Sequence, residues 1–96
     1  MSDVPEGAPK PQPQIHINVG DDIKRGIYAN FLAVSHSPHE FTLDFCQIQP
    51  GQPDRLQAEV VARLRIAPTL VGKIIRALNT NMTNYEDAYG LVKEIG

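Results

Sequence analysis

The 96-residue sequence has a single cysteine, no long apolar run and no strong excess of either charge. The lone Cys46 excludes an internal disulfide and weakly favours a reducing compartment. A membrane-spanning helix needs about 20 consecutive apolar residues, so no span is expected. Nine basic and eleven acidic residues give a net charge of −2, which provides no general attraction to nucleic acid or to an anionic membrane.

Targeting signals and familiar enzyme motifs are also missing. The N-terminus lacks the basic start and apolar block of a secretory signal, so a cytoplasmic location is expected. No phosphate-binding loop, dinucleotide-binding glycine motif or paired-acid motif occurs. Asp21 and Asp22 lack the further oxygen ligands of a calcium loop, and a turn is expected there. The sequence therefore predicts neither an enzyme activity nor a cofactor.

The most regular patterns lie in the C-terminal half of the chain. Apolar and polar residues alternate from Leu56 to Ile66, which predicts a strand with one buried face. Beyond Pro68, apolar residues recur every three or four positions as far as Tyr89, which predicts a helix with one apolar stripe. Proline suits the first position of a helix, and Gly90 suits the residue just past its end.

Shorter patterns upstream predict the rest of an antiparallel sheet. Residues 1–14 are rich in proline and are expected to form a flexible tail. Strands are expected at residues 15–19, 27–35 and 41–48, the last two joined by a hairpin turn. The sequence therefore predicts one α+β domain over residues 15–96, in which a four-stranded antiparallel sheet carries one long C-terminal helix packed on it.

The turn expected at residues 50–54 predicts the register of the two strands that it joins. Symmetric pairing across that turn places Phe45 opposite Val60 on the apolar face. The same register places Glu40 opposite Arg65 on the outer face, where opposite charges favour the pairing.

The strand expected at residues 27–35 is apolar on both faces, and one helix covers only one of them. A domain of about 80 residues has a small core, and association with a second copy is the simplest source of cover. We therefore expect a homo-oligomer, most simply a dimer. The candidate interface residues are Tyr28, Phe31, Leu32 and Val34, and the sequence leaves open which face of the strand meets the helix.

Histidine, cysteine and arginine residues supply the remaining candidate sites. His36 and His39 lie three residues apart, but zinc needs a third or fourth ligand nearby. Cys46 paired with a histidine would lack a third group to orient the pair, so no metal ligand or catalytic residue is assigned.

Basic residues of the last strand and of the helix are candidates for contacting a charged partner. They are Arg63, Arg65, Lys73 and Arg76. Acidic residues are expected beside the two arginines, so pairing within the sheet is favoured and nucleic-acid binding is not expected.

Several short motifs occur together in this chain. They are Gly26-Ile27-Tyr28-Ala29-Asn30, His36-Ser37-Pro38-His39-Glu40-Phe41, Asp44-Phe45 and Gln49-Pro50-Gly51, followed by Arg63, Pro68, Ala77-Leu78, Asn81, Tyr85-Glu86 and Gly90. The combination resembles a family of short bacterial and archaeal proteins catalogued as a domain of unknown function. The likeness covers residues 15–95, with the tail outside it. It implies a small cytoplasmic domain of strands and a helix, and no substrate, cofactor or catalytic residue.

The order of the expected elements is also similar to that of the bacterial export chaperone SecB. Long antiparallel strands precede a helix that opens at a proline, which is a likeness of layout without a shared motif.

The sequence thus predicts a non-catalytic binding or assembly module, with a second copy of itself and an unidentified protein as partners. Three alternatives stay open. One is a SecB-like holdase that binds unfolded chains on apolar sheet surface. The second is a nucleic-acid-binding protein that uses the arginine face, and the third is a metal- or thiol-dependent enzyme.

Overall fold

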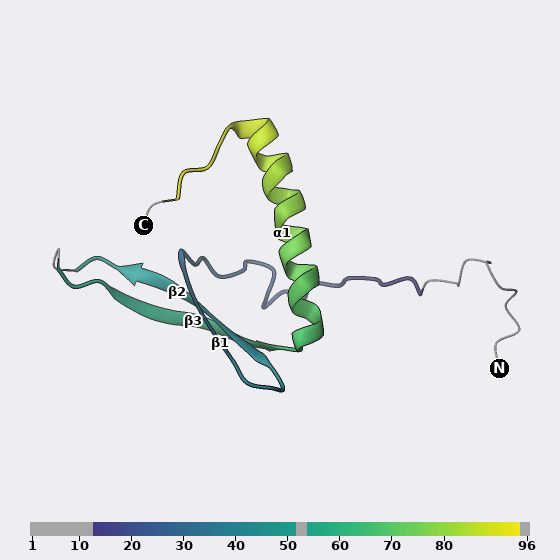
Figure 1. Ribbon diagram of the computed structural model, residues 1–96, viewed down its shortest axis with the longest axis horizontal. Coiled ribbons are helices and arrows are strands. Elements are labelled where there is room, and N and C mark those ends of the chain that lie inside the picture. Colours follow the sequence, from purple (N-terminus) through teal and green to yellow (C-terminus); the bar gives the residue numbers. More distant parts are fainter. Residues whose placement is uncertain (1–12, 52–53, 95–96) are drawn as a thin grey trace, which may run out of the picture.

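The structure of the protein is a computed structural model that describes residues 13–51 and 54–94. Within those residues it contains three strands and one helix (Figure 1): β1 (Phe31–His36), β2 (Phe41–Gln49), β3 (Gln57–Ile66) and α1 (Pro68–Tyr89). The strands form one antiparallel sheet in the order β1–β2–β3. The predicted α+β class, with an antiparallel sheet and one C-terminal helix, is confirmed.

The sheet has three strands in the described chain rather than the predicted four. Residues 15–19 form no strand there, and β1 begins at Phe31 instead of residue 27. Just before β1, the Asn30 N–H donates to the Cys46 carbonyl at 2.9 Å, and side chains make the next bonds to β2. Asn30 Oδ1 accepts the Ile48 N–H at 2.8 Å, and Gln47 Nε2 donates to the Tyr28 carbonyl at 2.8 Å. Residues 1–12 of the predicted tail lie outside the described residues.

The expected turn at residues 20–25 is present. The N–H groups of Ile23 and Lys24 both donate to the Gly20 carbonyl at 3.0 Å, which closes a single helical turn. Gly26 follows with a φ of 68°, a left-handed conformation that glycine adopts without a Cβ penalty. This turn separates residues 13–19 from the rest of the chain.

The register of β2 and β3 differs from the prediction. Phe45 lies opposite Ala62 rather than Val60, and Arg65 lies opposite Thr42 rather than Glu40. The alternation changes between Phe45 and Cys46, where an extra residue of β3 forms a β-bulge. The prediction assumed symmetric pairing across the turn at residues 50–54. It did not allow for the extra residue in β3 or for the actual length of the connection, and the predicted register was therefore wrong. Beyond the bulge, Val60 shares a face with Cys46.

The helix has the predicted bounds. Ala67 is extended, with φ −66° and ψ 141°, as expected for a residue before proline, and Pro68 occupies the first turn. At the other end Gly90 has a φ of 102°, and its N–H donates to the Glu86 carbonyl at 2.9 Å. The polar middle of α1 uses side chains locally, since Asn81 Nδ2 donates to the Ala77 carbonyl at 2.9 Å.

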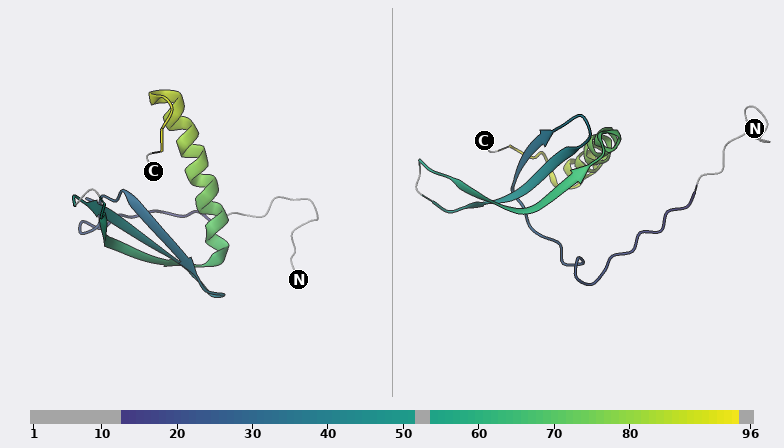
Figure 2. Two further views of the ribbon diagram at one scale, coloured as in Figure 1. Left: turned by 60° about the vertical axis from the view of Figure 1, so that its left-hand side comes forward. Right: turned by 90° about the horizontal axis from the view of Figure 1, so that it is seen from below.

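The apolar face of the sheet turns towards the first half of α1. The two elements enclose an apolar cavity of about 280 Å³, whose lining comprises Leu32, Val34, Phe41, Leu43, Phe45 and Ile66 of the sheet and Val71, Ile74, Ile75 and Leu78 of α1. This settles which face of β1 meets the helix. The second half of α1 extends beyond the sheet (Figures 1 and 2). No side chain of α1 is fully buried, and Cys46 is the buried apolar residue of the described chain.

Candidate functional site

The second half of α1 carries an apolar stripe that the described chain does not cover. Its members are Leu78, Met82, Tyr85 and Tyr89, which are between 47% and 78% exposed. The rings of Tyr85 and Tyr89 contact each other, with centroids 4.9 Å apart. The stripe lines a shallow hollow with Asn81 and Asn84 and no residue of the sheet. Large apolar patches on soluble proteins are where partners bind, so this stripe is a candidate interaction surface. We call these four residues the helix stripe.

A second uncovered surface lies at the N-terminal end of the described chain. We call residues 13–19 the N-terminal arm. Ile15, Ile17 and Val19 are 83%, 86% and 60% exposed. No backbone hydrogen bond joins the arm to any strand in the described residues. Figure 2 shows the arm leaving the body of the molecule and running into solvent. The arm therefore has the pattern of a strand without the partner that a strand needs.

The four predicted interface residues are placed on different surfaces. Leu32 and Val34 line the cavity beneath α1, although they remain 45% and 55% exposed. Phe31 lies opposite Cys46, on the face of the sheet turned away from α1, and Tyr28 is 72% exposed in the segment before β1. The structure therefore brings Leu32 and Val34 together and separates them from Phe31.

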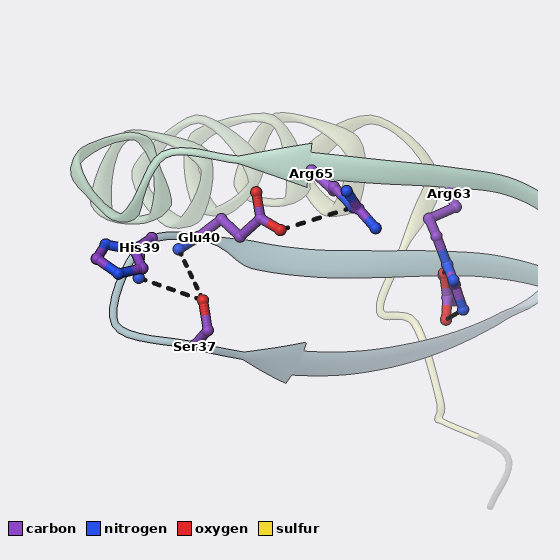
Figure 3. A network of polar contacts seen from close by, with 6 residues as sticks. Ser37, His39, Glu40, Arg63 and Arg65 are labelled. Atoms are coloured by element: carbon purple, nitrogen blue, oxygen red, sulfur yellow. Dashed lines mark hydrogen bonds and ion pairs between the residues drawn. The ribbon is translucent and has the colours of Figure 1, made fainter.

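The face of the sheet turned away from α1 carries charged pairs (Figure 3). Arg63 of β3 bonds to both carboxylate oxygens of Asp44 of β2: Nε donates to Oδ1 at 2.6 Å and Nη2 to Oδ2 at 3.0 Å. Arg65 Nε lies 3.6 Å from Glu40 Oε1, diagonally across the register. The hydrogen bond from Arg63 lowers the pKa of the Asp44 carboxyl below its ordinary value of 3.8, and the same bond raises the pKa of Arg63.

We expect the Asp44–Arg63 pair to make stability depend on pH in acid. Because the folded pKa of Asp44 is lowered, its contribution is present in full above pH 3.8 and is lost as pH falls through the lowered pKa. Asp44→Asn should therefore lower the urea midpoint at pH 7 and have less effect at about pH 2.5. Glu40→Gln, which removes only the longer pair, is the control and should change the midpoint less. A difference between wild type and Asp44→Asn that stays constant from neutral to acid pH would contradict this.

The four candidate basic residues do not form one surface. Arg63 and Arg65 lie on the outer face of the sheet, each beside a carboxylate, whereas Lys73 and Arg76 belong to α1, on the other side of the sheet. Neither Lys73 nor Arg76 makes an ion pair with any residue that the structure describes. The expected pairing of the two arginines within the sheet is present, and contact of the four residues with a charged partner stays a prediction.

We expect at most weak binding of DNA or RNA at physiological salt. Duplex or single-stranded nucleic acid would have to displace the carboxylates from Arg63 and Arg65 and would find Lys73 and Arg76 elsewhere. A fluorescence titration at two salt concentrations measures this. Submicromolar affinity with a steep salt slope that Arg63→Ala and Arg65→Ala weaken would refute the expectation.

The histidine and cysteine candidates are separated in space. The His36 ring stacks on Phe41 at 5.4 Å between centroids, and the His39 N–H donates to Ser37 Oγ at 3.2 Å within the hairpin turn. Cys46 is buried, and its thiol donates to the Asp44 carbonyl at 3.4 Å. No group of three or more His, Cys, Asp or Glu side chains placed to hold a metal ion is found in the described residues. These side chains therefore serve the turn and the sheet in this structure.

One contact at the end of α1 was given no partner from the sequence. The Glu86 carboxylate accepts the Val92 N–H at 2.9 Å and ties the residues after α1 to the helix end. A carboxylate near a helix C-terminus opposes the helix dipole. That unfavourable position was the available signal that Glu86 contacts another group.

The sequence predicts no membrane-spanning helix. Within residues 13–51 and 54–94, no helix combines the length and the hydropathy that a bilayer crossing requires.

Comparison with known proteins places the chain in a family. A family model described as a protein of unknown function, DUF3467, matches residues 1–94. The chain belongs to this family. The resemblance drawn from the motifs is thereby confirmed, and its extent is corrected, because the match includes the proline-rich tail that was expected to lie outside it. Neither a search of curated proteins nor a search of solved structures found a match. Membership of DUF3467 brings no substrate or partner to this chain.

Proposed function

We propose that this member of DUF3467 is a non-catalytic assembly module of the cytoplasm that works as a homodimer. The observation that supports it is uncovered apolar surface. All four residues of the helix stripe are between 47% and 78% exposed, and Phe31 of β1 is 48% exposed. The described chain offers no other element to cover the stripe, whose hollow is lined by α1 alone. Exposed apolar surface of this kind favours association.

A second copy is the occupant that we propose for this surface. Most soluble oligomers are symmetric, and a two-fold axis lets one apolar patch cover its own equivalent. The helix stripe suits such an arrangement because its large side chains project on one side of a helix that leaves the sheet. The predicted interface residue Phe31, which is 48% exposed, adds apolar surface on β1.

Sedimentation equilibrium of the full chain at micromolar concentration tests the dimer. We expect a mass of two chains and a thermal midpoint that rises with protein concentration, because dimerisation stabilises only the folded state. A chain that stays folded as a monomer on dilution would sink the proposal.

A SecB-like holdase is the second candidate, and the cavity between sheet and helix favours it. That cavity is lined by apolar side chains and is partly open to solvent, so it can take up an apolar segment of another chain. Suppression of light scattering by an aggregating client protein separates the two functions. A holdase suppresses it at equimolar chain, whereas an assembly module whose surface is already paired leaves it unchanged.

A further inference from the structure

The N-terminal arm has a strand pattern and no partner, and this points to where its partner lies. Ile15, Ile17 and Val19 alternate with His16 and Asn18, which is the period of a strand with one apolar face. A strand that pairs with nothing leaves its backbone donors and acceptors to water and its apolar face exposed. To pair as a strand, the arm therefore needs a sheet edge that it does not contact within the described chain.

The described sheet offers two edges, and they differ in protection. The edge strand β3 contains Glu59, Arg63 and Arg65 as well as the β-bulge, and charges and bulges are the usual devices that block pairing at an edge. The edge strand β1 has the sequence Phe-Leu-Ala-Val-Ser-His, with no Lys, Arg, Asp, Glu or Pro and no register shift against β2. The edge of β1 is therefore the one open to an added strand.

We propose that the arm of one copy pairs with the edge of β1 in a second copy, so that the fourth strand of each sheet comes from the partner chain. This rests on the proposed homodimer and names the segment that joins its two copies. Each chain presents one arm and one β1 edge, so two chains can exchange arms reciprocally, and reciprocal exchange closes as a two-fold dimer.

The two segments match in pattern as well as in length. The arm offers five alternating residues, and β1 offers six. With the apolar face of the arm turned to the helix side, its isoleucines continue the surface of Leu32 and Val34. Its polar side chains then lie beside the small residues Ala33 and Ser35 on the outer face. Added at β3 instead, His16 would lie beside Arg63 or Arg65.

The path of the chain favours pairing of the arm with β1 of a second copy over pairing with β1 of its own chain. The turn at residues 20–25 and the left-handed Gly26 send the arm away from the sheet (Figures 1 and 2). Residues 28 and 30 are held to β2 by the side-chain bonds of Gln47 and Asn30, which fix the entry into β1.

A pair of single variants tests the exchange. Ile17→Asp places a charge on the apolar face of the arm, and Asn18→Asp places the same charge on its polar face. Both residues are exposed in one chain, so neither substitution removes a contact within it. We expect Ile17→Asp to weaken the dimer by roughly 100-fold in dissociation constant and Asn18→Asp to leave it close to wild type, as measured by sedimentation equilibrium. Circular dichroism at matched concentration checks that both variants fold.

Cross-linking between differently labelled chains identifies the edge. In a Cys46→Ala background, chains with Ile17→Cys are mixed with chains carrying either Val34→Cys in β1 or Glu59→Cys in β3, and a short bismaleimide is added. Val34 and Glu59 both lie on the helix side of the sheet, where the proposed pairing places Ile17. A mixed cross-link can form only between chains. We expect it with Val34→Cys and not with Glu59→Cys.

The outcomes separate the exchange from the dimer itself. A wild-type chain that is monomeric overturns both. A dimer that persists with Ile17→Asp leaves the assembly module standing and overturns the exchange. A cross-link formed with Glu59→Cys alone overturns the assignment to β1.

Discussion

Met82→Asp is expected to convert the dimer into a monomer at micromolar concentration, whereas Thr80→Asp leaves the mass unchanged. Met82 belongs to the helix stripe, is 47% exposed and lies beyond the part of α1 that faces the sheet. Thr80 is exposed too, but at about 100° per residue it lies about 200° around the helix from Met82. The two substitutions introduce the same charged residue into the same helix. Methionine is a better helix former than threonine, so Met82→Asp also loses roughly a few tenths of a kcal/mol of helix propensity, and circular dichroism checks that α1 still forms.

The physical reason is the loss of apolar burial together with the cost of burying a charge. Full burial of a methionine side chain contributes about 1.5–3 kcal/mol, and an unpaired carboxylate in a closed interface costs more. Two-fold symmetry doubles the effect, because each substitution is present in both copies. Sedimentation equilibrium gives the mass, and the concentration dependence of the thermal midpoint should vanish in Met82→Asp. Retention of the dimer by Met82→Asp would remove the helix stripe from the interface.

Phe45→Ala is expected to lower the free energy of unfolding by about 3 kcal/mol, the low end of the range for truncating a core phenylalanine, because Phe45 is half-buried. Phe45 contributes to the cavity beneath α1 and also to a second hollow of about 300 Å³, where Ile27 and Ala29 approach the sheet. One side chain thus joins the segment before β1, the middle strand and the helix. Because domains of this size have a total stability of about 5–15 kcal/mol, the loss is a large fraction of the whole.

Ile48→Ala in the same strand is the matched control. Ile48 is 37% exposed and lies beyond the β-bulge, on the face turned away from α1. Ile48→Ala should lower the free energy of unfolding by about 1 kcal/mol or less. Urea titrations followed by circular dichroism at a fixed protein concentration measure both. Equal losses in the two variants would show that Phe45 does not link the sheet to the helix.

The helix and the middle of the sheet follow from local sequence. Pro68 and Gly90 fix the ends of α1 through their own backbone preferences, and the apolar period between them is a property of the segment itself. Alternation likewise predicted β2 and β3 to within one residue at each end. These features depend on neighbours along the chain, and a single sequence carries that information.

Only the tertiary structure decided the register of β2 and β3, the face of β1 that meets α1, and whether residues 15–19 pair as a strand. The β-bulge between Phe45 and Cys46 moves Val60 to the other face, and no residue type marks that insertion in the sequence. Which face of β1 meets α1 depends on how the helix crosses the sheet, so alternation left Leu32 and Phe31 equivalent until the cavity distinguished them. Residues 15–19 have the alternation of a strand. Alternation shows which side chains share an apolar face, but it does not show which sheet edge the strand pairs with. A strand forms only where a second strand supplies its hydrogen bonds, and that partner is a property of the tertiary or quaternary arrangement.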